Sequence, residues 1–385
     1  MNIMFVTLEF SASGGAGIYA LEVVNQLSRG GVTVHVMTSD INCNTKSTPN
    51  ILIHKLRVIN LPLVKIPLHH LQVWLKAGRI IKQNGISLVY SNNYAGAYVR
   101  SKVPFYATIH HPAKEEVKHS PTMQKIIYYP DIFFEQRVLK RARTIVVDSH
   151  LVRNMLRKLS PSSSFALMPC GINLESFSNN YSPNIRNSLG IDESELIIFF
   201  PGGARSKRKG ALDLLNALSI IKDFKFRCVV SGKIGDRDLG WRRELESALE
   251  KTKLQDRFIF VGELKCDELP GYYLAADIVV YPSTLEGFGL PALEALACGR
   301  PFIGTRTGEM PYIIKDKENG LLVDVNNPEQ LAESLNTMMT SEDFRNKISI
   351  KARASIKKYS WETLAESLIV LFKDPESSIY ENIAE

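Results

Sequence analysis

Residues 281–307 read YPSTLEGFGLPALEALACGRPFIGTRT and follow a short apolar strand-like run at 278–281. The stretch crosses a Glu-Gly-Phe-Gly turn and enters a helical segment through Pro291, whose missing N–H costs nothing in the first helical turn. The helical segment ends at Gly299, and a second strand-like run follows. A strand, a helix and a further strand in this order form a parallel pair. The stretch therefore predicts a parallel sheet with helices packed on it.

The same alternation of strand-like and helical segments runs through the chain on both sides of this stretch. The first half has strand-like runs at 3–8, 32–37, 51–58, 88–91, 105–110, 144–148 and 165–169. The second half has them at 196–200, 227–230, 258–261, 278–281, 302–304 and 321–323. Between the halves, residues 171–195 are rich in Asn, Ser and Gly, which is typical of a linker. We therefore predict an α/β fold of two doubly wound, Rossmann-like, parallel-sheet domains that face each other across a ligand-binding cleft.

The expected domains are residues 1–171, residues 172–360, and a C-terminal helix and tail at 361–385, for which packing back on the first domain is one option. A chain of 385 residues is long enough for two separate cores of about 150 residues each. Its 45% hydrophobic and 23% charged residues exclude a disordered or collagen-like protein. The five widely spaced cysteines form no pattern for a disulfide framework or a metal site. The first residues lack the basic region of a secretory signal, and no apolar run reaches the length of about 18 that a membrane span needs, so we expect a cytoplasmic protein.

The formal net charge of +7 hides an asymmetry between the two halves. Residues 1–171 carry 20 Lys and Arg against 8 Asp and Glu, a net of +12, whereas the remaining residues carry a net of -5. A basic first half suits an anionic partner such as a lipid surface. Basic, partly apolar helical segments at 61–83 and 114–143 favour peripheral binding to the inner face of the cell membrane. The first segment places Leu71, Trp74, Leu75 and Ile81 on one side; core helices with a solvated basic side are the alternative.

The turn that opens the helix after residue 289 carries the groups suited to an anionic ligand. Free N–H groups of Phe288, Gly289 and Leu290 would point out of the positive end of this helix, where a phosphate or a sugar oxygen binds well. Glu286 and Glu294 are eight positions apart, so their carboxylates can accept hydrogen bonds from hydroxyls in different parts of one elongated ligand. An ordinary strand-to-helix turn with one solvated and one capping Glu is the alternative.

These residues resemble the signature of glycosyltransferase family 4, the retaining enzymes of GT-B fold. The resemblance implies that Glu286 contacts the donor sugar and that Glu294 holds the ribose of the nucleotide. It also implies that the first domain binds the acceptor and the second binds the nucleotide sugar. The donor nucleotide diphosphate sugar is a substrate, so the resemblance implies no cofactor and no metal.

Four further segments carry the same resemblance, two of them in the second half of the chain. FFPGGARSKRKGALDLLNAL, at 199–218, is similar to the stretch whose Arg and Lys bind the donor diphosphate, which implies these roles for Arg205 and Lys209. The usual spacing places Ala204 at the arginine position, so Arg208 is the alternative to Arg205. FVGEL, at 260–264, is similar to the segment whose backbone contacts the base, which implies that role for Leu264.

The remaining similar segments lie in the first half and at the linker. SGGAG, at 13–17, resembles the glycine loop that approaches the diphosphate, which implies that role for Gly14 and Gly15. PCGIN, at 169–173, resembles the family's interdomain motif.

All eight histidines lie within the first 150 residues, so any imidazole in the cleft comes from the first domain. His110 and His111 end a strand-like run, where functional residues of a parallel sheet gather. In similar enzymes a His at this place contacts the donor sugar near the reacting carbon, which implies that role for His110, with His111 in reserve. A His that caps the surface is the alternative. His150 is expected to begin a helix.

The predicted function is transfer of a hexose from a UDP- or GDP-sugar to a hydroxyl of a glycan or lipid-linked acceptor, in surface polysaccharide or glycolipid assembly. The alternatives are a sugar-nucleotide epimerase of the same fold and a non-catalytic partner in a glycan assembly complex. A nicotinamide dehydrogenase and a phosphate-loop nucleotidase are excluded because neither G-x-G-x-x-G nor G-x-x-x-x-G-K-[ST] occurs. No nucleic-acid recognition motif accompanies the basic charge, so nucleic acid is not an expected partner.

Overall fold

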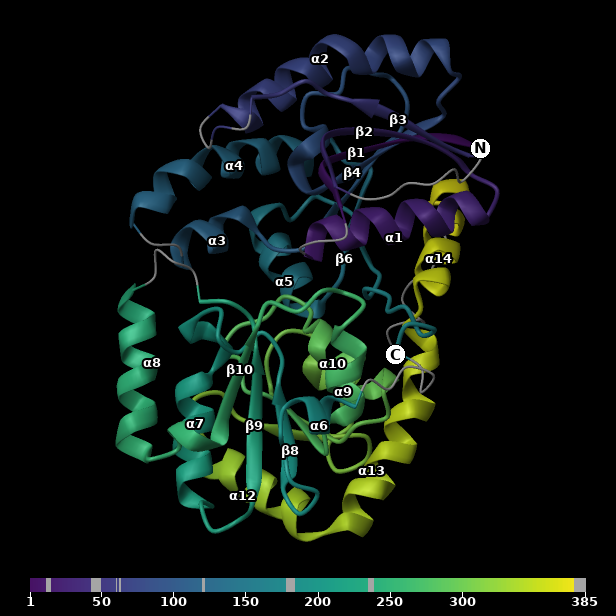
Figure 1. The fold of residues 1–385 in the computed structure, drawn as a ribbon. Helices are drawn as coiled ribbons and strands as arrows, with labels where there is room; N and C mark the ends of the chain where they lie inside the picture. The colour runs from purple at the N-terminus through teal and green to yellow at the C-terminus, as the bar shows by residue number, and fades with distance from the viewer. Residues whose placement is uncertain are drawn as a thin grey trace. The chain divides into compact units, whose positions relative to one another are not determined.

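The computed structural model describes residues 1–11, 15–42, 50–59, 61, 64–119, 122–177, 184–234 and 239–376. It divides into two compact units, and Figure 1 shows their elements. Unit 1 contains Met1–Gly171 and Trp361–Glu385, and unit 2 contains Ile172–Ser360. Each unit has one parallel sheet with helices around it, which confirms the α/β prediction of two Rossmann-like domains.

The sheet of unit 1 has seven strands in the order β3-β2-β1-β4-β5-β6-β7. These strands are β1 (Asn2–Ser11), β2 (Thr33–Asn42), β3 (Ile51–Lys55), β4 (Leu88–Asn92), β5 (Phe105–Ile109), β6 (Thr144–Val147) and β7 (Phe165–Leu167). The helices are α1 (Gly15–Arg29), α2 (Lys65–Gln83), α3 (Ala113–His119), α4 (Thr122–Arg141), α5 (His150–Leu159) and α14 (Trp361–Lys373), with the 3-10 turn η1 (Asn93–Gly96). The chain order reverses between β1 and β4, so their carboxyl ends mark the switch point where such sheets bind ligands.

The sheet of unit 2 has six strands in the order β10-β9-β8-β11-β12-β13, with its own switch point between β8 and β11. The strands are β8 (Leu196–Phe200), β9 (Phe226–Ser231), β10 (Phe258–Gly262), β11 (Ile278–Tyr281), β12 (Phe302–Thr305) and β13 (Leu321–Val323). The helices are α6 (Ile185–Ser188), α7 (Ala211–Ile220), α8 (Leu239–Thr252), α9 (Leu269–Ala275), α10 (Leu290–Ala297), α11 (Met310–Ile313), α12 (Pro328–Thr340) and α13 (Glu342–Ser355). The 3-10 turns are η2 (Lys207–Lys209), η3 (Gln255–Arg257) and η4 (Ile356–Lys358).

Helix α14 packs on unit 1 although it follows unit 2 in the chain. The ring of Phe372 lies 5.4 Å from that of Tyr90 and 5.1 Å from that of Tyr106, between ring centroids. Trp361 packs edge-on against Tyr19 of α1, and Figure 1 shows α14 beside α1. Such aromatic contacts stabilise the packing beyond the area that they bury.

The placement of α14 changes the charge asymmetry between the two parts of the protein. The segment 361–385 carries one Lys against six Asp and Glu. With this segment counted in unit 1, unit 1 has a net charge of +7 and unit 2 a net charge of zero. The acidity of the second half of the sequence is therefore not a property of the second unit.

Helix α2 buries one face and leaves several of its apolar side chains exposed. His69, His70, Val73, Ala77 and Ile81 are buried. By contrast Leu71, Trp74 and Leu75 are exposed by 50%, 37% and 59%. Of the four apolar residues that the sequence analysis placed on one side, Ile81 is therefore buried and the other three are exposed, while His69 and His70 pack in the interior. No helix among the described residues is both long and apolar enough to cross a membrane.

Candidate active site

The switch point of unit 2 brings two loops together at the carboxyl ends of β8 and β11. The loop after β8 ends in η2 and Gly210, and the loop after β11 runs to the start of α10. Gly210 has φ +82°, and a Cβ atom there would lie 1.9 Å from the carbonyl oxygen of Pro282. The N–H of Thr284 donates to the carbonyl of Arg208 at 2.9 Å. Only glycine allows this close approach, which places Lys209 beside the second loop.

The carboxylate of Glu286 is the centre of this arrangement. Its Oε1 accepts hydrogen bonds from Lys209 Nζ at 2.8 Å, Arg208 at 3.1 Å, Tyr281 OH at 2.9 Å and Ser283 Oγ at 2.7 Å. Burial acts to raise the pKa of Glu286, but the cations of Lys209 and Arg208 outweigh it and lower this pKa below its ordinary value. No described residue donates a hydrogen bond to Oε2, so this oxygen can accept one from a hydroxyl of a ligand.

Lys209 is the second buried charge at this point. Its side chain is 15% exposed, and Nζ contacts both Glu286 and the hydroxyl of Tyr281. Burial lowers the pKa of Lys209, and the positive charge of Arg208 lowers it further, whereas Glu286 acts in the opposite direction. Unit 2 therefore holds a Lys and Glu pair in fixed positions, which can bind an anion and a hydroxyl side by side.

The two candidate arginines have different partners. Arg208 contacts the Glu286 carboxylate and the carbonyl of Leu285, whereas Arg205 pairs with Glu263 and is 55% exposed. Ala204 is 2% exposed, so its position faces the interior of the unit. Arg208 is the arginine that shares a partner with Lys209, and Arg205 is the one whose charge acts on Glu294.

Glu294 lies inside α10 and accepts a hydrogen bond from the hydroxyl of Tyr273 at 2.5 Å. Burial raises the pKa of Glu294 to about 7, although the hydrogen bond from Tyr273 and the charge of Arg205 oppose this shift. The carboxyl group therefore changes its charge near neutral pH.

The start of α10 confirms the predicted strand, turn and helix. Leu290 begins the helix after Gly289, whose φ of +97° makes glycine the favoured residue there. The side chain of Phe288 is buried, so Phe288 can meet a ligand only through its backbone. Among the described residues, none accepts a hydrogen bond from the N–H of Phe288, Gly289 or Leu290.

The other predicted donor-binding residues lie at strand ends or beyond the described part. Leu264 follows β10 and is partly buried. Gly15 is the exposed first residue of α1, after β1, whereas Gly14 lies outside the described residues.

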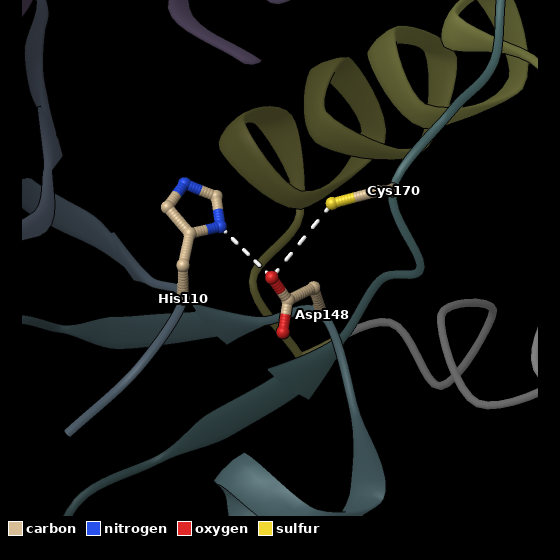
Figure 2. Close-up of side chains that lie close together, drawn as sticks. All are labelled: His110, Asp148 and Cys170. Carbon is tan, nitrogen blue, oxygen red and sulfur yellow. Dashed lines mark hydrogen bonds and ion pairs between the residues drawn. The ribbon is translucent and has the colours of Figure 1, made fainter. Parts of the chain in front are cut away.

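His110 follows β5 in unit 1 and is surrounded by residues that follow neighbouring strands. Its Nδ1 lies 2.8 Å from Oδ2 of Asp148, which follows β6, and its Nε2 lies 3.1 Å from Oδ1 of Asn92, at the end of β4. The thiol of Cys170 lies 3.7 Å from the same Asp148 oxygen, as Figure 2 shows. Ligand atoms of His110, Asp148 and Cys170 lie within 4.8 Å of one another, a separation that could hold a metal ion. His150 begins α5, as predicted.

The sequence prediction missed five side chains that touch its candidate residues. They are Tyr281 and Ser283 at Glu286, Tyr273 at Glu294, and Asn92 and Asp148 at His110. Four of them stand at or just after the carboxyl end of a strand, which is the signal that could have found them. Tyr273 lies in α9, 21 residues from Glu294, and no local pattern pairs the two.

Comparison with known proteins places both halves of the chain in one family. The model of glycosyltransferase family 4 matches residues 13–176, and that of the glycosyl transferases group 1 matches residues 182–355. The D-inositol 3-phosphate glycosyltransferase of Corynebacterium jeikeium is 28% identical over 389 residues, which cover 94% of this chain and 92% of that protein.

Solved structures share the fold over nearly the whole chain. Sucrose-phosphate synthase of Thermosynechococcus elongatus matches with a TM-score of 0.81 and 23% identity, over 97% of this chain and 98% of that one. Anabaena HepE in complex with UDP-glucose matches with a TM-score of 0.74 and 18% identity, over 97% and 99% of the two chains. At these identities the likeness shows the fold alone, which is that of GT-B glycosyltransferases. The chain belongs to the glycosyltransferases of family 4 and group 1 and has the GT-B fold.

Proposed function

We propose that this protein is a retaining hexosyltransferase that takes its sugar from a UDP- or GDP-sugar. The observation that carries the proposal is the carboxylate of Glu286, whose Oε1 is held by Lys209 and three other donors while Oε2 is left for a sugar hydroxyl. HepE, which shares the fold, binds UDP-glucose, and this supports a nucleotide sugar as the donor.

The cations beside Glu286 suit a leaving nucleoside diphosphate. As the bond between the sugar and the diphosphate breaks, negative charge grows on a phosphate oxygen, and a fixed ammonium group stabilises that charge. In this mechanism the acceptor attacks from the side that the diphosphate leaves, and the acceptor's proton passes to the departing phosphate oxygen. Lys209, one arginine and the start of α10 supply the positive field, so we expect turnover without a divalent metal.

The acceptor in this proposal is a hydroxyl of a glycan or a lipid-linked glycan, within surface polysaccharide or glycolipid assembly. A panel of UDP- and GDP-sugars, scored for thermal stabilisation and for hydrolysis without an acceptor, tests the donor. Binding of a nucleotide sugar followed by slow hydrolysis supports transfer. Conversion of the sugar to its epimer would contradict the proposal in favour of an epimerase. Absence of binding to every nucleotide sugar would contradict it in favour of a non-catalytic partner.

Nucleotide affinity is expected to rise with pH if Glu294 binds the ribose. The ionised carboxylate of Glu294 accepts hydrogen bonds with both oxygens, whereas the protonated carboxyl group does not. A pKa of about 7 means that about a tenth of Glu294 is ionised at pH 6 and about nine tenths at pH 8. UDP affinity measured by calorimetry should therefore increase about tenfold over this range.

The Glu294→Gln variant is the control for this pH dependence, because UDP itself also titrates. Its affinity should be lower than that of the wild type at pH 8 and should show only the pH dependence of the nucleotide. Equal pH dependence in the two proteins would contradict the ribose-binding role.

We also propose that unit 1 binds an anionic membrane surface through α2 and α4. Leu71, Trp74 and Leu75 on α2 and Tyr129 and Phe133 on α4 are exposed. The two helices share one core cluster through Val73, Ala77 and Val138. Lys76, Arg79 and Lys82 are exposed on α2, next to its apolar side chains. Exposed apolar groups beside basic ones are typical of peripheral membrane binding.

Flotation with vesicles tests this surface. The double variant Trp74→Ser, Leu75→Ser should lose most of the binding to vesicles that contain anionic lipid, whereas Ile350→Ser should keep it. Ile350 is the matched control because it is 74% exposed on α13 of unit 2. Equal flotation with neutral vesicles, or none with either, would contradict the proposal.

A further inference from the structure

Trp241 is the buried aromatic side chain through which α8 holds the loop after β8. The residue is 4% exposed, and its indole N–H donates to the carbonyl of Ala204 at 3.1 Å. A buried indole N–H needs such an acceptor, because it has lost its hydrogen bonds with water. Ala204 directly precedes Arg205 in the chain. The hydrogen bond therefore fixes the peptide from which the arginine side chain starts.

The end of β9 fixes the same loop from a second direction. The N–H of Gly202 donates to Oγ of Ser231 at 2.9 Å, and the N–H of Ala204 donates to the carbonyl of Ser231 at 3.3 Å. The N–H of Arg205 donates to the carbonyl of Gly202 at 3.2 Å, and Gly202 has φ +65° in this turn. Trp241 and β9 thus hold the peptides on both sides of Ala204.

The stem of Arg205 lies on the bare backbone of Gly232. A Cβ atom at Gly232 would lie 2.8 Å from Cγ of Arg205, so glycine is needed for this approach. The guanidinium group pairs with one oxygen of Glu263, and the N–H of Lys233 donates to the other oxygen at 3.3 Å. Arg205 therefore points its exposed guanidinium group from a stem whose position is fixed.

The two arginines of this loop act on different groups. Arg208 contacts the carboxylate of Glu286, so its charge is used inside the protein. The charge of Arg205 lowers the pKa of Lys209 and opposes the rise in the pKa of Glu294. Its own partner Glu263 is exposed, and an exposed ion pair contributes little. Arg205 can therefore exchange this partner for a phosphate group close to Lys209.

We propose that Trp241 is a positioning residue that sets the direction of Arg205 through the carbonyl of Ala204, and that Arg205 is the arginine that binds the donor diphosphate. The inference rests on the proposed function, in which the donor is a nucleotide sugar. On binding, Arg205 exchanges its pair with Glu263 for charge-assisted hydrogen bonds to phosphate oxygens.

A double-mutant cycle on UDP affinity tests whether Trp241 acts through Arg205. Trp241→Phe keeps an aromatic ring in the core but removes the N–H donor. We expect it to weaken UDP binding about threefold to tenfold. Arg205→Gln should weaken it about tenfold or more, because charge-assisted hydrogen bonds are lost.

The double variant carries the decision. When Arg205 is already replaced, Trp241→Phe should weaken UDP binding no further, because its effect passes through the arginine. Losses that multiply would show that Trp241 acts on the unit as a whole and would overturn the positioning role. GDP replaces UDP in all variants if the wild type binds GDP alone.

A second cycle with Arg208→Gln distinguishes the two arginines. Its loss should multiply with that of Trp241→Phe, because Arg208 is held by Glu286 and not by the Ala204 peptide. A larger loss of UDP affinity in Arg208→Gln than in Arg205→Gln would overturn the assignment of the diphosphate to Arg205. This comparison keeps the proposal falsifiable if Trp241→Phe does not fold.

Glu244→Gln is the matched control, because Glu244 also joins α8 to this loop. Its carboxylate pairs with Lys207 in an exposed contact, so the change should leave UDP affinity within about twofold. An equal loss in Glu244→Gln and Trp241→Phe would overturn the specific role of Trp241. A wild type that binds neither UDP nor GDP would overturn the proposed function together with this inference. Binding by the wild type with losses that multiply would overturn the inference alone.

Discussion

Replacing Lys209 with Ala is expected to lower turnover about 100-fold or more, because it removes a preorganised cation from the site of growing negative charge. The ammonium group is largely buried and lies 2.8 Å from Glu286, so its position is fixed before the substrate binds. Water that enters the vacated space would have to reorient during the reaction, which a fixed charge avoids. Hydrolysis or transfer of the nucleotide sugar that the wild type accepts is the measurement.

Lys207→Ala is the matched control for this change. Lys207 lies two residues away in η2, pairs with Glu244 at 2.5 Å and is 65% exposed. The control should keep turnover within about twofold, since exposed ion pairs contribute little. Near-normal turnover in the Lys209 variant would remove Lys209 from the mechanism, and an equal loss in both variants would indicate a general effect of the loop's charge.

Replacing Gly210 with Ala is expected to lower the free energy of unfolding of unit 2 by about 3 kcal/mol or more. The left-handed backbone accounts for about 1–2 kcal/mol of this loss. The remainder arises because the new Cβ would overlap the carbonyl oxygen of Pro282, 1.9 Å away, and both atoms belong to backbones that must shift. Denaturant unfolding measures the loss as the change in the free energy of unfolding for the transition of unit 2.

Gly190→Ala separates the two contributions to this loss. Gly190 has φ +64°, and a Cβ atom there would meet nothing within 4 Å. This control should therefore show only the backbone cost of about 1–2 kcal/mol. Equal destabilisation by the two substitutions would contradict the close contact between the loops after β8 and β11.

Much of the fold could be predicted because local patterns in the sequence reflect the same forces that form the elements. Runs such as 196–200, 278–281 and 321–323 are short and apolar, and the structure has strands with these bounds. The helix after Gly289 was predicted from Pro291 and the glycine turn, which restrict the backbone locally. The buried face of α2 was not predicted, because the burial of His69 and His70 depends on residues far along the chain, such as Ser39, Ala95 and Phe134.

The candidate site was predictable to the extent that its residues follow strands or match a family motif. Glu286 and Lys209 are 77 positions apart, and the resemblance named both without showing that they touch. Tyr281 and Ser283 complete the surroundings of Glu286 but appear in the sequence only as polar residues at the end of a strand. The hydrogen bonds that link Asn92, His110 and Asp148 join residues at the ends of three strands, and the spacing of these residues in the sequence does not predict them.

The sequence by itself determined the two parallel-sheet domains, the strand ends at which functional residues gather, and the family's glutamates and lysine. These follow from periodicity, glycine and proline positions, and short motifs, all of which act within a few residues. Only the tertiary structure decided that α14 packs on unit 1, that unit 2 carries no net charge, and that both nitrogens of His110 face oxygens. These properties depend on contacts between segments up to hundreds of residues apart, which form only when the sheets assemble.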